Sequence, residues 1–272
     1  MKKKLKPKKL LWYYGAKTYL LDDIFNKVYE LYPERMTVFV DVFGGSGTVV
    51  LNVPPEWKVN RIYNDIDLRL YNLLNVLRDD EKRKKLFDML DWSLPHRKIF
   101  EDLKQQTEFK DDVEMVYNYL YRHFCSFNND DNSFGVSIKS QRNVFHEQIN
   151  LLKRNFFEIK YLSIECLDYK ELIKKYDSPT TFFYLDPPYL EQGHHYKSYF
   201  TLEDFQELHN ILLNIKGYWL MNESERDFPE LIKIFGEPQM VKEYSNNVNH
   251  NRKQINSENR IKYRKEGFWY NF

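Results

Sequence analysis

Short runs rich in β-branched and aromatic residues alternate along this chain with segments whose apolar residues recur at helical spacing. The helical spacing is clearest from Leu20 to Leu31 and from Leu202 to Ile215, where Thr201 and Asp204 form a candidate capping box. The runs predict strands at 37–42, 60–64, 159–164, 181–185, 217–221, 239–244 and 267–272. Strands and helices in alternation favour an α/β fold with a mostly parallel, seven-stranded sheet.

The alternation breaks between residues 80 and 158. This stretch contains no convincing strand, and its apolar residues between Val113 and Phe124 lie on one face of a helix. A polar loop, Ser126 to Gly135, follows that helix. We therefore expect residues 80–158 to be an inserted, mainly helical subdomain and residues 1–79 and 159–272 to make up the α/β domain.

Composition and charge limit the function classes. No apolar run approaches the roughly 20 residues of a membrane span, and the basic start lacks a signal-peptide core, so a cytoplasmic location without membrane contact is expected. The net charge of +1 argues against a simple polyanion binder. Basic residues nevertheless concentrate in 2–9 and 245–265, which suits either a passing phosphate backbone or two solvated segments.

A glycine cluster follows the first predicted strand. The chain has only nine glycines, and three of them, Gly44, Gly45 and Gly47, fall within four residues. Such residues permit positive φ angles and close approach of a ligand to the backbone. A dinucleotide motif would place a third Gly or Ala at Val50 and would not carry Asp41 in the strand. The pattern from Asp41 through Phe43 to Gly47 is instead typical of S-adenosylmethionine-dependent methyltransferases; dinucleotide binding and a structural turn are the alternatives. A helix is expected to begin at Thr48.

The second predicted strand ends in Asn64, Asp65, Ile66 and Asp67. An acid at this place can accept hydrogen bonds from the two ribose hydroxyls of an adenosyl group. The alternative role is an N-cap for the helix that starts at Leu68, and Asp67 suits that role.

The strand at 181–185 leads into Asp186, Pro187, Pro188 and Tyr189. Consecutive prolines hold the chain extended and lack N–H groups, so their carbonyls are rigidly directed. Asp186 and the Pro187 carbonyl could accept the hydrogens of an exocyclic adenine amine and free its lone pair for attack on a sulfonium methyl group. Tyr189 could stack on a base that has swung out of a duplex. A plain strand-terminating turn is the alternative interpretation.

Together these residues resemble the Dam-like (D12 class) adenine-specific DNA methyltransferases of the α-type motif order. The resemblance implies their Rossmann-like fold, S-adenosylmethionine as cofactor, double-stranded DNA as partner and no metal. Asp186 to Tyr189 correspond to the catalytic tetrapeptide. The cofactor residues that the resemblance implies come from an amino-terminal motif, the glycine cluster, the ribose-binding acid with its apolar neighbour, and an acid–aromatic pair: Trp12, Tyr14, Gly15, Lys17, Asp41, Phe43, Gly44, Gly45, Gly47, Asp65, Ile66, Asp168 and Tyr169.

The expected DNA contacts lie in the insert and near the carboxyl end. Arg can read guanine and Asn adenine, which suggests the following residues: Arg122, Asn128, Asn129, Lys139, Arg142, Arg252 and Lys253. The loop from Ser126 to Gly135 departs from the family's Arg-rich hairpin because it holds two acids and no Arg. The resemblance therefore does not imply which DNA sequence is the target. A restriction endonuclease is a candidate partner. A monomer is favoured as the oligomeric state.

Two other functions stay open on the sequence alone. One keeps methyl transfer but changes the acceptor to RNA or a protein amide, which related tetrapeptides with Asn in place of Asp serve. The other is a DNA-binding module with inactive motifs, which the intact Asp186 and glycine cluster disfavour. Asp186 and the motif order favour DNA as the acceptor.

Overall fold

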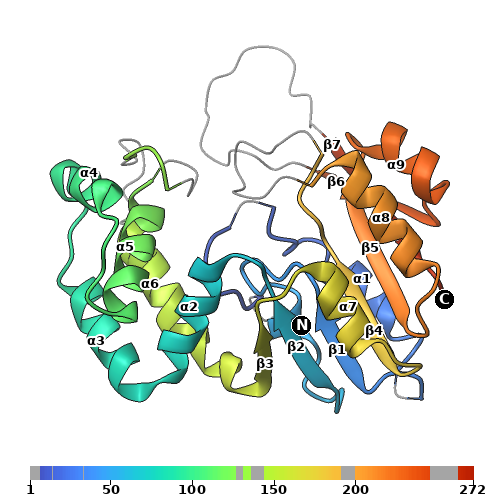
Figure 1. Cartoon of the computed structure of the whole chain (residues 1–272), viewed down its shortest axis with the longest axis horizontal. Helices are drawn as coiled ribbons and strands as arrows, with labels where there is room; N and C mark the ends of the chain where they lie inside the picture. The colour runs from blue at the N-terminus through green and yellow to red at the C-terminus, as the bar shows by residue number, and fades with distance from the viewer. Residues whose placement is uncertain are drawn as a thin grey trace. The chain divides into compact units, whose positions relative to one another are not determined.

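Strands and helices alternate in the structure, a computed structural model, as the sequence predicts (Figure 1). It describes residues 7–13, 15–32, 34–126, 131–135, 144–190, 200–245 and 263–272. The chain divides into two units, Met1–Leu172 and Ile173–Phe272. The boundaries 80–158 of the expected insert do not coincide with this division and remain a prediction.

The seven strands form one sheet in the order β3-β2-β1-β4-β5-β7-β6. The pairs β1–β2, β2–β3 and β4–β5 are parallel, and β7 pairs antiparallel with β5 and β6. The predicted mixed α/β fold with a mostly parallel sheet is thus confirmed. The strands are β1 (Val38–Asp41), β2 (Asn60–Asn64), β3 (Leu162–Glu165), β4 (Thr181–Leu185), β5 (Tyr218–Ser224), β6 (Met240–Ser245) and β7 (Tyr263–Tyr270).

The strands and helices of the first unit share one hydrophobic core. One buried apolar cluster runs from Tyr63 in β2 through leucines of α2 to Phe100 and Leu120 in the helices beyond. Fully burying each such side chain contributes about 1.5–3 kcal/mol, so this cluster is the main source of the unit's stability. The elements are α1 (Leu21–Val28), η1 (Val50–Asn52), α2 (Leu68–Arg78), α3 (Asp80–Asp91), α4 (Arg97–Gln105), α5 (Asp112–Cys125), α6 (Val144–Asn155), the 3₁₀ segment η3 (Phe156–Tyr161) and α7 (Tyr169–Tyr176), which crosses into the second unit.

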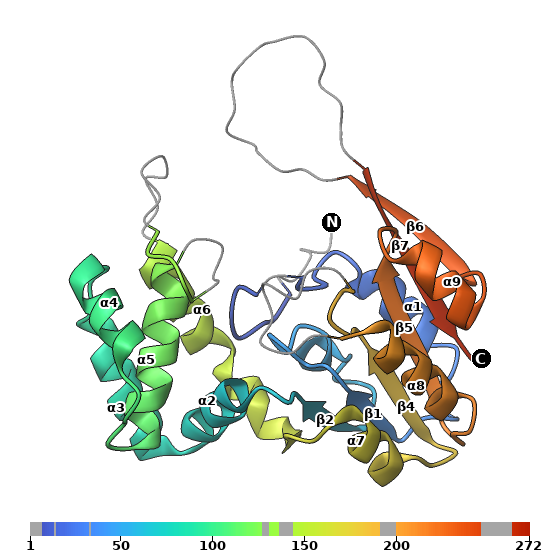
Figure 2. The same ribbon diagram turned by 45° about the horizontal axis from the view of Figure 1, so that its top comes forward.

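The segment from residue 80 to residue 155 is helical wherever the structure describes it, apart from its connections. Helices α3, α4 and α6 all pack on α5, and Figure 2 shows them as one group. Residues 131–135 return to α5, because Gly135 N donates to the Cys125 carbonyl at 2.8 Å and Ser126 bridges Phe134. The helical character predicted for this stretch is therefore correct.

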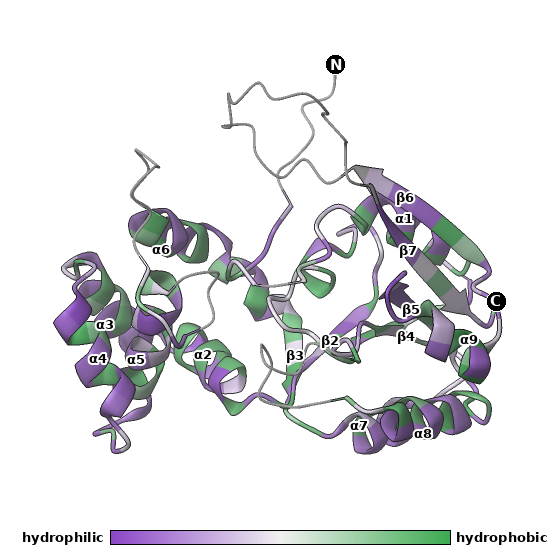
Figure 3. Cartoon of the chain, turned by 90° about the horizontal axis from the view of Figure 1, so that it is seen from above, coloured by the Kyte–Doolittle hydropathy of each residue, from purple (hydrophilic) through white to green (hydrophobic). Residues whose placement is uncertain are grey.

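The second unit contains β4, β5, β6 and β7 with α8 (Leu202–Leu212) and α9 (Phe228–Phe235). Hydrophobic and hydrophilic residues both occur around α8 (Figure 3), and Phe205, Leu208 and Leu212 form its buried face. The predicted capping box is present, since the side chain of Thr201 accepts from Asp204 N at 3.1 Å.

Several local predictions were wrong. The strand expected at 267–272 is β7, Tyr263–Tyr270, and the one expected at 217–221 extends to Ser224, because the two strands pair as far as Ser224 and Glu266 and β7 pairs with β6 from Tyr263. Residues 159–161 belong to η3, and β3 starts only at Leu162, because pairing with β2 begins where Leu162 meets Arg61. No α-helix begins at Thr48; the chain makes the short η1 turn at Val50–Asn52, and the prolines at 54 and 55 prevent its extension. None of the described helices is long and apolar enough to span a membrane.

Candidate active site

The glycine loop, residues 44–47, follows β1 in the chain and contacts the end of β2 in the first unit. Gly45 and Gly47 adopt φ angles of +48° and +72°, which side chains strongly disfavour. Gly44 has a different reason to be glycine: its N–H donates to the Asn64 carbonyl at 2.7 Å, and an added Cβ would lie 2.4 Å from the Tyr63 ring. The loop is thus shaped by one close strand approach and two left-handed residues.

Asp41 is the last residue of β1, and its carboxylate binds the backbone that follows the glycine loop. Its side chain is only 1% exposed, and Oδ2 accepts a hydrogen bond from Val50 N at 3.1 Å. The bond fixes the turn that follows the glycines, so the described contact of Asp41 is with the protein backbone.

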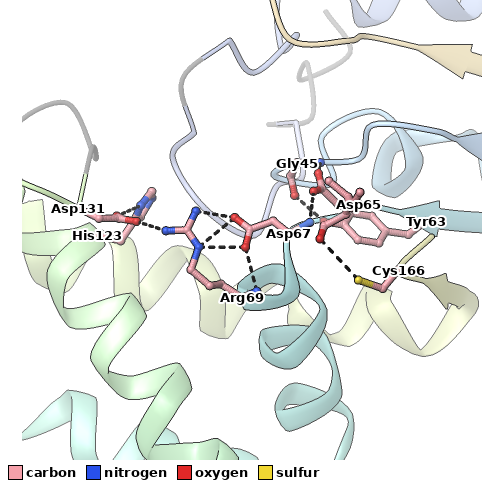
Figure 4. Close-up of polar contacts among 9 residues, drawn as sticks. Gly45, Tyr63, Asp65, Asp67, Arg69, His123, Asp131 and Cys166 are labelled. Atoms are coloured by element: carbon pink, nitrogen blue, oxygen red, sulfur yellow. Dashed lines mark hydrogen bonds and ion pairs between the residues drawn. The ribbon is translucent and has the colours of Figure 1, made fainter. Parts of the chain in front are cut away.

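Asp65 follows β2 directly and closes the other side of the loop. Its Oδ2 accepts from Gly45 N at 2.8 Å and its Oδ1 from Asp67 N at 2.9 Å, while Tyr63 Oη donates to the Gly45 carbonyl at 2.8 Å (Figure 4). Burial raises the pKa of Asp65 to about 6, although the two backbone N–H groups act in the opposite direction. A carboxylate beside a glycine loop can accept hydroxyl donors, and it is the stronger acceptor in its ionised form.

Apolar and acidic side chains flank this carboxylate. The Phe43 ring lies 6.0 Å from the Tyr169 ring, and Ile66 is 53% exposed. Asp168 is half-buried, and its Oδ1 accepts from Lys170 N at 2.9 Å at the start of α7. As predicted, Asp41, Asp65 and Asp168 stand at or just beyond the carboxyl ends of their strands.

Asn64 is a site residue that the sequence reasoning did not single out. Its Nδ2 donates to the carbonyls of Val42 at 2.9 Å and Leu167 at 3.1 Å, and its Oδ1 accepts from Leu167 N at 2.9 Å. One buried amide thereby holds the segments after β1 and β3 to the end of β2. The available signal was a polar residue directly after the buried Ile62 and Tyr63 at the end of the strand.

The amino-terminal motif packs on the glycine loop. Leu10 N donates to the Ser46 carbonyl at 3.0 Å, and a Cβ at Gly45 would lie 3.6 Å from the Tyr13 ring. Trp12 and Gly15 are half-buried, whereas Lys17 is only 3% exposed and its Nζ donates to the Gly15 carbonyl at 3.2 Å. The structure therefore brings this motif and the glycine loop together, with Tyr14 outside the described residues.

In the second unit, β4 is buried along its whole length and leads into the tetrapeptide. Pro187 is buried, and Asp186, Pro188 and Tyr189 are half-buried. The strand is secured beneath them, because the hydroxyl of Tyr184 donates to Oδ1 of the fully buried Asn222 in β5. A rigid strand end thus presents the prolines and the two polar side chains, as the sequence predicts.

The expected DNA contacts fall mostly outside the described residues: Asn128, Asn129, Lys139, Arg142, Arg252 and Lys253. Arg122 lies on α5, half-buried, and burial lowers its pKa. Among the described side chains, no group of three or more His, Cys, Asp or Glu residues could hold a metal ion.

Comparison with known proteins matches this arrangement to one family. The family model of the D12 class N6 adenine-specific DNA methyltransferases matches residues 13–253, which include both the glycine loop and the tetrapeptide. The chain belongs to this family. The chain is also similar to the modification methylase StsI of Streptococcus sanguinis, to which it is 26% identical over 196 residues. That match covers 65% of this chain but only 28% of the relative.

Proposed function

We propose that this D12 methyltransferase transfers a methyl group from S-adenosylmethionine to the N6 amine of an adenine flipped out of double-stranded DNA. The observation that carries the proposal is the Asp65 carboxylate, held by Gly45 N–H at 2.8 Å at the edge of the glycine loop. Family membership supports adenine as the target, and the tetrapeptide after β4 supplies residues for the chemistry.

The cofactor loop suits an adenosyl group better than a dinucleotide. Asp41 and Asp65 both point their charge at the loop backbone, which disfavours the pyrophosphate of a dinucleotide. Asp65 would accept the ribose hydroxyls, and Ile66 and Phe43 offer apolar surface for the adenine ring. Trp12, Gly15 and Lys17 would complete the site from the amino-terminal motif, with Asp168 and Tyr169 on the side of α7. When bound, S-adenosylmethionine supplies an electrophilic methyl group on sulfur.

The tetrapeptide would prepare the adenine. The N6 lone pair is delocalised into the ring, so the amine is a poor nucleophile. Asp186 Oδ and the Pro187 carbonyl would accept its two hydrogens, drawing nitrogen towards tetrahedral geometry and freeing the lone pair. Asp186 would then hold the proton that the nitrogen releases, and Tyr189 would stack on the flipped base.

The biological setting is also a proposal. The relative's name, modification methylase, suggests that this chain modifies DNA alongside a restriction endonuclease. DNA would run along the helical segment 80–158, with Arg122 and the basic residues named above as its contacts, and the enzyme would work as a cytoplasmic monomer.

The test compares Asp186→Asn with the unaltered protein. We expect the variant to bind S-adenosylmethionine in calorimetry with unchanged affinity and to lose methyl transfer to DNA by at least about 100-fold, because an amide cannot take the proton. Asp204→Asn, at the exposed capping box, is the matched control and should keep full activity. Undiminished methylation by Asp186→Asn would overturn the mechanism. Sequencing that detects modified adenines in DNA from cells expressing the chain would identify the target.

A further inference from the structure

A continuous line of charged contacts runs away from Asp65 through the first unit (Figure 4). Asp67, whose N–H donates to Asp65, caps α2 and receives Arg69 Nε on Oδ1 at 2.9 Å. Arg69 Nη1 reaches Asp131 Oδ2 at 2.6 Å, and Asp131 Oδ1 lies 2.9 Å from His123 Nδ1. We refer to Arg69, Asp131 and His123 as the triad.

The line of contacts returns to the glycine loop at its other end. His123 Nε2 lies 2.9 Å from the Trp12 carbonyl, and its ring stacks on that of Tyr13 at 6.2 Å. Tyr13 in turn covers Gly45, whose N–H is bound by Asp65. The triad therefore connects the two residues on either side of Gly45, one from the amino-terminal motif and one from the end of β2.

Burial and contacts with several elements hold the side chains of the triad in place. Its side chains come from α2, α5 and the loop after α5, and those of Asp131 and His123 are 9% and 2% exposed. The Arg69 guanidinium also lies over the Tyr119 ring at 4.9 Å. Asp131 adopts a φ of +63°, a conformation that only Asp, Asn and Gly tolerate well. Asp131 thus combines a left-handed backbone with a buried carboxylate whose two oxygens contact Arg69 and His123.

His123 completes the line of contacts. Its two ring nitrogens face two oxygens, Asp131 Oδ1 at 2.9 Å and the Trp12 carbonyl at 2.9 Å. The Tyr119 ring lies 5.6 Å from the His123 ring. Arg69 contacts the carboxylates of both Asp67 and Asp131, so one guanidinium joins the end of β2 to the loop that holds His123.

We propose that Arg69, Asp131 and His123 are positioning residues, which hold Tyr13 and Asp65 at the correct separation across Gly45 to receive the cofactor. The proposal rests on the function proposed above. The triad belongs to the first unit, whereas the tetrapeptide begins at Asp186 in the second. The effect should thus be on cofactor affinity and not on the methyl-transfer step at saturating cofactor.

The experiment measures S-adenosylhomocysteine binding by calorimetry, and KM for S-adenosylmethionine and kcat on unmethylated mixed-sequence DNA. Asp131→Asn keeps the tolerated backbone conformation but loses the charge. His123→Asn keeps a polar side chain near Asp131 but loses the contact with the Trp12 carbonyl. We expect each to raise Kd and KM about ten-fold while kcat stays within about two-fold. Asp91→Asn, which breaks the Asp91–Lys153 pair between α3 and α6, is the control and should change neither.

The outcomes separate the two proposals. The positioning role is wrong if folded Asp131→Asn or His123→Asn shows unchanged Kd and KM. It is also wrong if kcat alone falls, which is the result expected from a loss of folded enzyme. Should both variants unfold, Arg69→Lys keeps the charge without the fork that spans Asp67 and Asp131, and it must raise KM for the role to stand. An unaltered protein that binds no S-adenosylhomocysteine would instead overturn the proposed function.

Discussion

Asp65 connects the stability of the protein to its proposed cofactor binding, and the variant Asp65→Asn tests that connection. Burial raises the pKa of this carboxyl from its ordinary 3.8 to about 6. The folded state therefore binds a proton more tightly than the unfolded state does. We expect the ionised Asp65 carboxylate to lower the free energy of unfolding of the enzyme without cofactor, because the charged form is needed for cofactor binding and not for folding.

The sign and size of that cost follow from linkage. Below about pH 3 the carboxyl is protonated in both states and costs almost nothing. As the pH rises from about 3 to about 6, the unfolded state releases its proton first, so the free energy of unfolding falls. Because a pKa difference of one corresponds to about 1.4 kcal/mol, the change from 3.8 to about 6 amounts to about 3 kcal/mol. Above about pH 7 the carboxyl is ionised in both states, and the loss is complete and constant.

Urea unfolding of both proteins between pH 4 and pH 8 measures this quantity. The free energy of unfolding of the unaltered protein minus that of Asp65→Asn should fall by about 2 kcal/mol from pH 4 to pH 6.5, and then stay nearly level. Most of the rest of the total of about 3 kcal/mol lies below pH 4, where the unfolded carboxyl begins to ionise. Subtracting the variant removes the titration of all other groups. The asparagine also places one amide donor against Gly45 N–H or Asp67 N–H, which costs about 1–3 kcal/mol at every pH and leaves the slope unaffected.

Cofactor binding should change in the opposite direction with pH. Protonation removes the negative charge that strengthens the hydrogen bonds from the ribose hydroxyls, so the S-adenosylhomocysteine affinity of the unaltered protein should fall as the pH drops below about 6. A difference in unfolding free energy that is flat or rises between pH 4 and pH 6.5 would refute the argument that burial raises this pKa.

Further predictions concern the strand ends that shape the loop. Gly44→Ala should lower the free energy of unfolding by about 1–3 kcal/mol, because its Cβ would meet the Tyr63 ring at 2.4 Å; Gly236→Ala, with nothing within 4 Å, tests positive φ alone and should cost less in the same urea titration. Asn64→Ala should cost about 2–4 kcal/mol by thermal unfolding, since three hydrogen bonds between strand ends are lost, whereas the exposed Asn60→Ala in the same strand should cost under about 0.5 kcal/mol. Equal effects of the two asparagine variants would contradict the role of Asn64.

Local signals were sufficient for much of the fold. The strands at 60–64 and 181–185 occur at the predicted residues, Asp67 caps α2, and the Thr201 capping box is formed. These features depend on neighbours a few residues apart in the chain, and side-chain periodicity or backbone capping expresses them directly. The predictions failed at 159–161 and at Thr48, where pairing with a distant strand or a nearby proline pair overrode local propensity.

The sequence by itself determined the order of the motifs and their placement at strand ends, because strands, glycine turns and Asp-Pro-Pro-Tyr are local patterns. Only the tertiary structure decided which polar groups meet. Trp12 lies 111 residues from His123, Arg69 lies 62 from Asp131, and Asn64 lies 103 from Leu167, yet the members of each pair are hydrogen-bonded partners. A buried polar group must find a partner, but its own sequence neighbourhood does not say which distant segment will supply one.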